Sequence, residues 1–200
     1  MIGERMNKNP FSGLVPFSYG LIMADPPWYF KNYSKKGEGR NATAHYNCMK
    51  LSEIKALPVH QLAADDCLLW LWATNPMLPQ ALEVISSWGF KFSTAGTWVK
   101  HMKSKDPEVP LGPVAFGGGY RLRSGNEPFL IGTYGKPKNA RDVSGVISAV
   151  RREHSRKPDE AYHAAAKLVP GVKKIELFAR EPREGWDVWG NETDKFSGPG

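Results

Sequence analysis

The chain has 200 residues, with 41% hydrophobic and 24% charged side chains, as in an ordinary globular domain. Its two cysteines, Cys48 and Cys67, lie far apart in no metal-ligand spacing, so we expect neither a disulfide framework nor a metal site. No apolar run approaches the roughly 18 residues that span a bilayer, and residues 1–5 lack the apolar core of a secretory signal. We therefore expect a cytoplasmic protein with no membrane partner. The net charge of +7 permits a polyanionic ligand.

The hydrophobic pattern predicts a polar leading segment, residues 1–18, followed by a single domain, residues 19–200. Apolar residues at helical spacing predict helices over 78–88, before Gly89, and from Pro158 to Pro170. A shorter helix should begin with Ser52 as its N-cap and end at Pro58. Apolar runs predict six strands, at 21–24, 67–72, 90–99, 128–134, 143–150 and 172–178.

The order of these elements predicts the fold class. Strands that alternate with helices form βαβ units, which give a Rossmann-like, three-layer α/β/α fold around a mostly parallel sheet. Residues 100–124 have no sustained period and predict a long loop, of a length that is usually functional or disordered. Neither a G-x-G-x-x-G fingerprint nor a P-loop occurs, which argues against nucleotide phosphate chemistry.

The most informative local feature is Asp25-Pro26-Pro27-Trp28, directly after the first predicted strand. Two prolines cannot continue a helix or a sheet interior, and they lack N–H donors. They can hold backbone carbonyls outward at the carboxyl end of a strand, where open α/β sheets bind ligands. Such acceptors, beside one carboxylate and one aromatic ring, suit an N–H-rich group such as the exocyclic amine of a nucleobase. A plain proline-rich turn is the alternative.

Basic residues concentrate in four predicted loop segments, at 31–40, 101–105, 121–123 and 151–157. Tyr33 lies within the first segment, and Tyr120 borders the third. Basic loops interleaved with aromatic residues are typical of phosphate contact combined with base stacking. For any single segment, a solvated basic surface is the alternative.

Further motifs flank the later predicted strands and can converge on the same rim: G-N-E at 125–127, S-x-K-P-D-E at 155–160, K-I-E-L-F-x-R at 174–180 and G-N-E at 190–192. In this combination and order, from about Leu21 to Glu192, the chain resembles the MT-A70 family of S-adenosylmethionine-dependent adenine-N6 methyltransferases. The resemblance implies the methyltransferase form of the Rossmann-like fold, with a permuted motif order. It also implies S-adenosylmethionine as the cofactor.

The resemblance assigns roles to individual residues. The turn formed by Asp25, Pro26, Pro27 and Trp28 is the catalytic segment that holds the target amine, with Asp25 also bordering the cofactor. Lys157 should contact the cofactor's carboxylate. Arg180, Asn191 and Glu192, which stands where relatives often have Gln, should contact its ribose. Substrate-side positions are Tyr29, Tyr46, Trp72 and Glu127, and spacing puts Asn7 nearest to the segment that holds the cofactor's adenine in relatives.

The chemistry agrees with these roles. The lone pair of adenine N6 is delocalised into the ring, so acceptors for both N–H groups, the Asp25 carboxylate and the Pro26 carbonyl, should favour a pyramidal nitrogen. The sulfonium donor is already activated, so the rate comes mainly from alignment of nitrogen, carbon and sulfur. Two alternatives remain. One is a catalytically inactive family member that binds nucleic acid as a scaffold, and the other is a cytosine-N4 DNA methyltransferase, which commonly has Ser in place of Asp25.

The resemblance leaves the polynucleotide open between DNA and RNA, with DNA favoured because many compact bacterial and phage members act on DNA. A target base in a duplex must be extruded, at a cost that a single-stranded substrate avoids. Relatives often pair two methyltransferase domains. A homodimer, or a paired methyltransferase-like subunit, is therefore a further expectation.

Overall fold

A computed structural model describes residues 9–28, 48–118, 121–153, 155–193 and 195. Its strands are β1 (Tyr19–Ala24), β2 (Ala63–Trp72), β3 (Lys91–His101), β4 (Asn126–Tyr134), β5 (Val146–Val150), β6 (Lys174–Leu177) and β7 (Asp187–Trp189). Its α-helices are α2 (Leu51–Lys55), α3 (Leu78–Ser87) and α4 (Asp159–Leu168), and short 3-10 turns occupy Val59–Gln61 and Asn75–Met77. Within these ranges no helix is both long and apolar enough to cross a membrane.

The strands form one seven-stranded sheet in the order β5-β3-β4-β2-β1-β6-β7. Every neighbouring pair is parallel except the two pairs that involve β4, which is antiparallel to both β2 and β3. The predicted mostly parallel, Rossmann-like sheet is thus confirmed, with one reversed strand that the βαβ pattern did not predict. Because β4 is reversed, its first residues lie at the edge of the sheet where β1 and β2 end.

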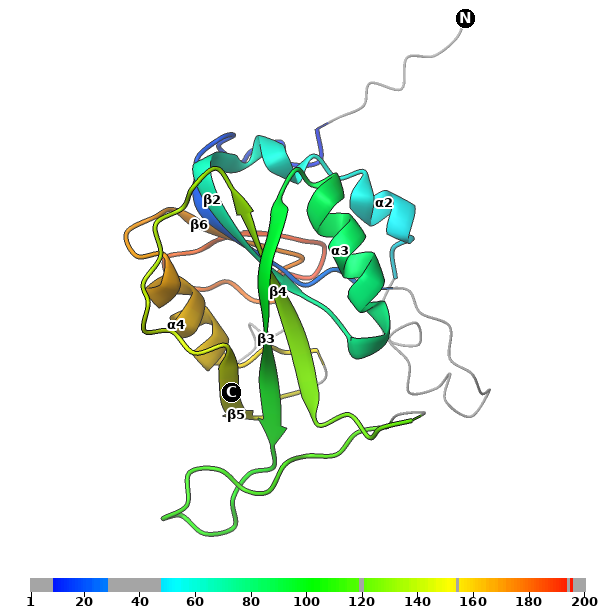
Figure 1. Cartoon of the computed structure of the whole chain (residues 1–200), viewed down its shortest axis with the longest axis vertical. Helices are drawn as coiled ribbons and strands as arrows, with labels where there is room; N and C mark the ends of the chain where they lie inside the picture. The colour runs from blue at the N-terminus through cyan, green and yellow to red at the C-terminus, as the bar shows by residue number, and fades with distance from the viewer. Residues whose placement is uncertain (1–8, 29–47, 119–120, 154, 194, 196–200) are drawn as a thin grey trace, which may run out of the picture.

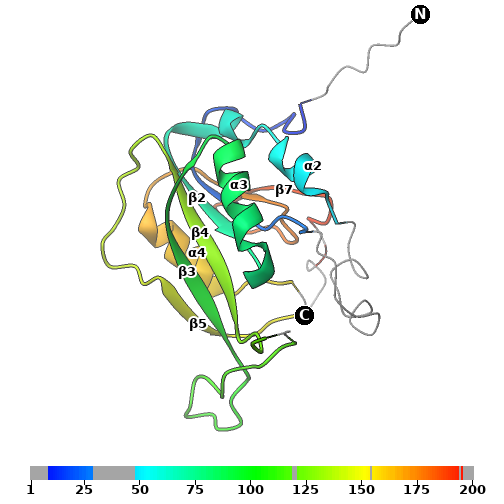
Figure 2. The ribbon, with the colours of Figure 1, turned by 45° about the vertical axis from the view of Figure 1, so that its right-hand side comes forward.

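Helices cover both faces of the sheet, which gives the predicted three layers. α2 and α3 lie on one face and α4 lies on the other (Figures 1 and 2). Side chains alternate along a strand, so Ile22 of β1 packs in the core on the α3 side and Met23 packs in the core on the α4 side. This explains why β1 and the second half of β2 are apolar without alternation: both faces are covered.

Three local features differ from the sequence-based expectations. Lys50, not Ser52, is the N-cap of α2, and its backbone N–H donates to the Glu53 carboxylate at 2.8 Å. Pro158 occupies the N-cap position of α4 with extended backbone, and the helix itself begins at Asp159. The three-residue strand β7 was not predicted, because Asp187–Trp189 is too short to show a period. Gly89 ends α3 with a φ of +83°, as predicted.

The described part of the connection from β3 to β4, residues 102–118 and 121–125, extends beyond the sheet (Figures 1 and 2), and we call it the arm. Its base is held by backbone hydrogen bonds: the Met102 N–H donates to the Pro113 carbonyl at 2.9 Å, and the Ala115 N–H donates to the Lys100 carbonyl at 2.7 Å. The Lys100 N–H in turn donates to the Gly125 carbonyl at 2.9 Å. The predicted long loop is therefore confirmed, except that Lys100 and His101 of the predicted range belong to β3.

Candidate active site

A cavity of about 640 Å³ opens where β1 ends and β4 begins. Its position follows from the topology, since the carboxyl ends of β1, β2 and β6 share this edge with the start of the reversed strand β4. Most of the residues assigned from the sequence meet on its wall. They are Asp25, Pro26, Pro27, Trp28, Glu127, Lys157 and Arg180, together with Lys100, Arg151 and Phe116.

The Asp25-Pro26-Pro27-Trp28 turn is fixed by its own backbone. The Trp28 N–H donates to the Pro26 carbonyl at 2.8 Å, and the Met49 N–H donates to the Pro27 carbonyl at 3.0 Å. A carbonyl oxygen has two lone pairs, so Pro26 retains one for a ligand. Trp28 is 5% exposed and donates from Nε1 to the Trp72 carbonyl at 3.2 Å. Its ring therefore anchors the turn in the core.

Ion pairs link the assigned residues in a chain of alternating charge. Glu127 lies between two ammonium groups, with Nζ of Lys100 and of Lys157 each 2.7 Å from one of its carboxylate oxygens. Lys157 Nζ is also 2.8 Å from Asp25 Oδ2. Arg180 continues the chain, at 3.7 Å from Asp25 and 3.7 Å from Glu192. The site therefore holds its charges in mutual contact before any ligand arrives.

The neighbours determine the charge state of this cluster. Burial by itself would raise the pKa of Glu127, but Lys157 and Lys100 outweigh it and lower the pKa to about 2. Burial would lower the pKa of Lys157, but Asp25 and Glu127 outweigh it and raise the pKa. Both side chains are therefore charged at neutral pH. Lys157, only 6% exposed, is a buried ammonium held in place by two carboxylates.

Trp72 supports the cluster from within the core. The structure places its side chain at 0% exposed, so it lies beneath the site and does not form part of the cavity wall. Lys157 Nζ lies 5.3 Å from the centre of its ring, within the range of a cation–π contact. Its ring packs edge-on against Trp98 and Phe129. This geometry places the Trp72 ring in contact with Lys157 and not with a substrate.

The residues assigned to the ribose reach the site through the unpredicted strand β7. Leu177 of β6 pairs with Trp189 of β7, so the following Asn191 and Glu192 come next to Arg180 at the end of β6. Asn191 is exposed, and Glu192 also pairs with Lys195 at 3.0 Å. Of the remaining assigned residues, Asn7, Tyr29 and Tyr46 lie outside the described ranges, as do Tyr33 and Tyr120.

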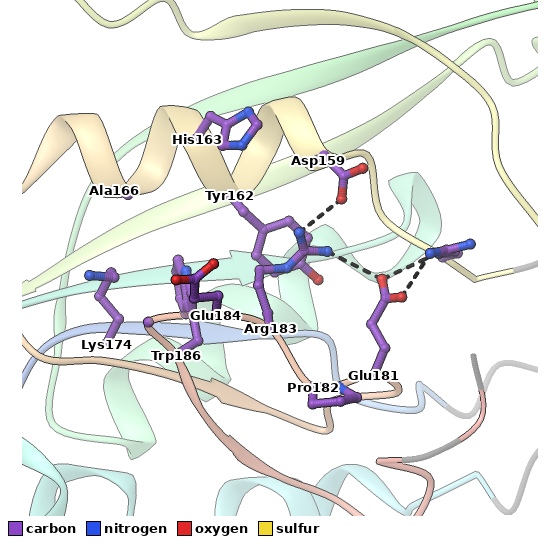
Figure 3. Close-up of a pocket in the computed structure, with 12 residues that line it drawn as sticks. Asp159, Tyr162, His163, Ala166, Lys174, Glu181, Pro182, Arg183, Glu184 and Trp186 are labelled. Carbon is purple, nitrogen blue, oxygen red and sulfur yellow. Dashed lines mark hydrogen bonds and ion pairs between the residues drawn. The ribbon is translucent and has the colours of Figure 1, made fainter. Parts of the chain in front are cut away.

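A second charged network, which the sequence did not reveal, braces the site from the α4 side (Figure 3). Arg183 contacts Asp159 at 2.9 Å and Glu181 at 3.2 Å, and Arg156 contacts Glu181 at 2.8 Å, around a cleft of about 520 Å³. Arg180 also donates to the Ser155 carbonyl at 2.7 Å. These contacts fix Lys157 and Arg180 relative to each other. One residue of this network could have been found from the sequence, because Asp159 belongs to the S-x-K-P-D-E motif.

The donor set fits an amino-acid and ribose ligand. Lys157 and Arg180 are cations for a carboxylate, and Asp25 and Glu192 are acceptors for an ammonium group or for hydroxyls. Glu176, behind them, has a buried Oε2 with no hydrogen-bond partner among the described residues. The cavity lies within the usual size range of cofactor sites. The residues present therefore fit S-adenosylmethionine.

A Rossmann-like sheet with one reversed strand, an acceptor-rich turn and this donor set define an S-adenosylmethionine-dependent methyltransferase. Within that class, the profile of the MT-A70 family matches residues 19–192, and the chain belongs to this family. The resemblance inferred from the motifs is thereby confirmed.

Three relatives illustrate the range of the family. The chain is 35% identical to the type II methyltransferase M.MunI of Mycoplasma sp, over 92% of this chain and 83% of the relative. It is 32% identical to an N(6)-adenosine-methyltransferase MT-A70-like protein of Arabidopsis thaliana, over 88% of this chain and 24% of the relative. It is 31% identical to the N(6)-adenosine-methyltransferase catalytic subunit METTL3 of Homo sapiens, over 88% of this chain and 28% of the relative. The chain thus spans about a quarter of the plant and human proteins.

Proposed function

We propose that this methyltransferase transfers the methyl group of S-adenosylmethionine to N6 of an adenine in a polynucleotide, and that the polynucleotide is DNA. One observation carries the proposal. The acceptors of Asp25 and Pro26 share a cavity wall with the cations Lys157 and Arg180. An amine and an amino-acid carboxylate can therefore be held side by side in one site.

Each residue has a role in this reaction. The Asp25 carboxylate and the free lone pair of the Pro26 carbonyl accept the two N–H groups of the target amine, which directs the nitrogen lone pair toward the methyl group. Lys157, Arg180, Asn191 and Glu192 would hold the cofactor, which when bound supplies a methyl group activated on a sulfonium. Glu127 fixes Lys157 and Lys100 at 2.7 Å, so the cations keep one geometry while the ligands bind.

The distribution of ion pairs supports a polynucleotide substrate. The cations next to Asp25 are paired with carboxylates, and so are those of the α4 network. By contrast, Lys103, Lys105 and Arg151 are exposed and have no ion-pair partner among the described residues. Lys103 and Lys105 belong to the arm, and Arg151 lines the cavity. An unpaired cation on the cavity wall and two more on the arm are suited to phosphate contacts, which position a strand without reading its sequence.

An aromatic group on the arm supports the same substrate. Phe116 is 62% exposed and lines the cavity, with the Arg123 guanidinium 5.6 Å from its ring. An exposed ring beside an arginine can stack on a base next to the target.

DNA is proposed over RNA because the match to the type II methyltransferase covers most of both chains, whereas the N(6)-adenosine relatives match over about a quarter of their own length.

The experiment is methyl transfer from isotopically labelled S-adenosylmethionine into matched single- and double-stranded DNA and RNA, with nucleoside mass spectrometry of the products. We expect label in N6-methyladenine from DNA. Label in N4-methylcytosine would assign the amine to cytosine, and label in RNA alone would reverse the choice of polynucleotide. Saturable cofactor binding without transfer to any polynucleotide would favour a protein that has kept the cofactor site and lost catalysis. Absence of cofactor binding would favour the inactive family member that binds nucleic acid as a scaffold.

A further inference from the structure

Glu176 is a buried carboxyl that the reaction described above does not use. It is 5% exposed and lies in β6, opposite Met23 of β1 and Val188 of β7. Lys157 is the other charged residue buried to this degree in the described ranges. A carboxyl group buried between two strands of a sheet requires a specific environment, because burial of an unpaired charge is costly.

The environment of Glu176 is asymmetric. Its Oε1 accepts a hydrogen bond from the Tyr162 hydroxyl of α4 at 2.6 Å. Its Oε2 is buried and has no hydrogen-bond partner among the described residues. Burial raises the pKa of Glu176 to about 7, and Asp25 acts in the same direction, against the Tyr162 hydrogen bond and the charges of Arg183 and Lys157. Tyr162 belongs to α4 and Asp25 follows β1. Arg183 lies in the loop before β7, and Lys157 lies just before α4.

The carboxyl group lies directly behind the candidate active site. Glu176 borders a narrow space of about 10 Å³, comparable to one water molecule, together with Asp25, Lys157 and Arg180. The same three residues line the large cavity. Glu176 therefore shares this space with three residues of the cavity wall, and two of them, Lys157 and Arg180, would hold the cofactor.

We propose that Glu176 is a charge-compensating residue of the cofactor site, partly protonated in the free protein and ionised when S-adenosylmethionine binds beside Asp25 and Lys157. This inference rests on the proposed cofactor site. S-adenosylmethionine brings two positive groups and one negative group, so its binding adds one net positive charge. A positive charge in a site of low dielectric favours the ionised form of a neighbouring carboxyl. S-adenosylhomocysteine lacks the sulfonium, so its binding adds no net charge.

The test is calorimetry of cofactor binding at pH 7 in two buffers with different ionisation enthalpies, which gives the number of protons released. We expect the native protein to release roughly half a proton per bound S-adenosylmethionine, and clearly less with S-adenosylhomocysteine. Glu176→Gln should remove this release while still binding the cofactor. Tyr162→Phe removes the hydrogen bond that opposes protonation of Glu176. Proton release by this variant on binding S-adenosylmethionine should therefore increase toward one proton.

A pH series on the native protein keeps the test independent of how the variants fold. Release should increase toward pH 6 and disappear by pH 9, where Glu176 is already ionised in the free protein. Equal release with both ligands, or unchanged release in a folded Glu176→Gln variant, would overturn the inference and leave the cofactor assignment intact. Absence of saturable binding of S-adenosylmethionine to the native protein would overturn both.

Discussion

Lys157 and Asp25, 132 residues apart in the chain, contact each other through Nζ and Oδ2 at 2.8 Å. One is assigned to the cofactor's carboxylate and the other to the substrate amine. In the free protein the two groups are paired with each other, so a ligand carboxylate on Lys157 and an amine on Asp25 each compete with this contact. Two ligands that draw on the same ion pair are thermodynamically coupled, and the coupling is reciprocal.

We therefore expect the cofactor product S-adenosylhomocysteine to raise the affinity for an adenine-containing oligonucleotide by about 5-fold or more, because a carboxylate on Lys157 leaves Asp25 available to the amine. Fluorescence anisotropy with and without the ligand measures the effect. Lys157→Met should weaken cofactor binding and remove the coupling. Equal oligonucleotide affinity with and without saturating ligand in the native protein would show that the pair does not couple the two sites.

Asp25→Ala should abolish methyl transfer, with a loss of at least about 100-fold, because the amine loses its charged acceptor in the transition state. Cofactor affinity should remain mostly intact, since Lys157 keeps Glu127 as its partner at 2.7 Å. Single-turnover transfer and calorimetric cofactor binding separate the two effects. An equal loss of both would mean that Asp25 mainly shapes the cofactor pocket.

Glu127 should make the protein sensitive to acid. Its pKa falls from an ordinary 4.5 to about 2 in the folded state, so the unfolded chain binds more protons between these values. Stability is then present above about pH 5 and lost as the pH falls toward 2, by about 3 kcal/mol in total. Urea unfolding across this range should show a shallower pH dependence for Glu127→Gln. Identical slopes would place the sensitivity elsewhere.

Glu176 should lower the stability of the protein at high pH, whereas Glu127 makes it sensitive to low pH. The pKa of Glu176 rises from an ordinary 4.5 to about 7 on folding, so its effect on stability is neutral below about pH 4.5 and becomes unfavourable as the pH rises through 7. Glu176→Gln should therefore match the native protein at pH 4 and exceed it at pH 8 by about 3 kcal/mol. Thermal and urea unfolding at both values measure this difference. A native protein that is the more stable of the two at pH 8 would contradict the prediction.

The unpaired cations should contribute to polynucleotide binding through phosphates. Arg151→Gln and Lys103→Gln should each weaken binding to all sequences alike and reduce the slope of log affinity against log salt by about 1. Lys138→Gln, at an exposed position after the opposite end of β4, is the matched control and should leave the slope unchanged. The same reduction in all three variants would indicate a general effect of net charge.

The main elements of the fold could be predicted because their signals are local. The apolar residues of β1 and β2, the helical spacing in α3 and α4, and Gly89 after α3 each reflect the burial of one short segment. The reversed direction of β4 could not be predicted, since a long loop between two strands allows either direction. Strand β7 was not predicted, because its three residues are too few to show a hydrophobic period. The Ser52 cap was wrong because Lys50 takes the N-cap position, where its backbone N–H donates to the Glu53 carboxylate.

The sequence by itself determined the chemistry available to this protein: a donor-poor turn at Asp25, a lysine in S-x-K-P-D-E and an arginine after K-I-E-L-F, in the order of one methyltransferase family. Their meaning depends on residue type and spacing, which are properties of the chain. Only the tertiary structure decided which charges meet. The contacts of Lys157 with Asp25 and Glu127, the position of Trp72 beneath that lysine and the unpartnered oxygen of Glu176 depend on how distant strands and α4 pack. Side-chain contact across a fold is long-range, so no local pattern specifies it.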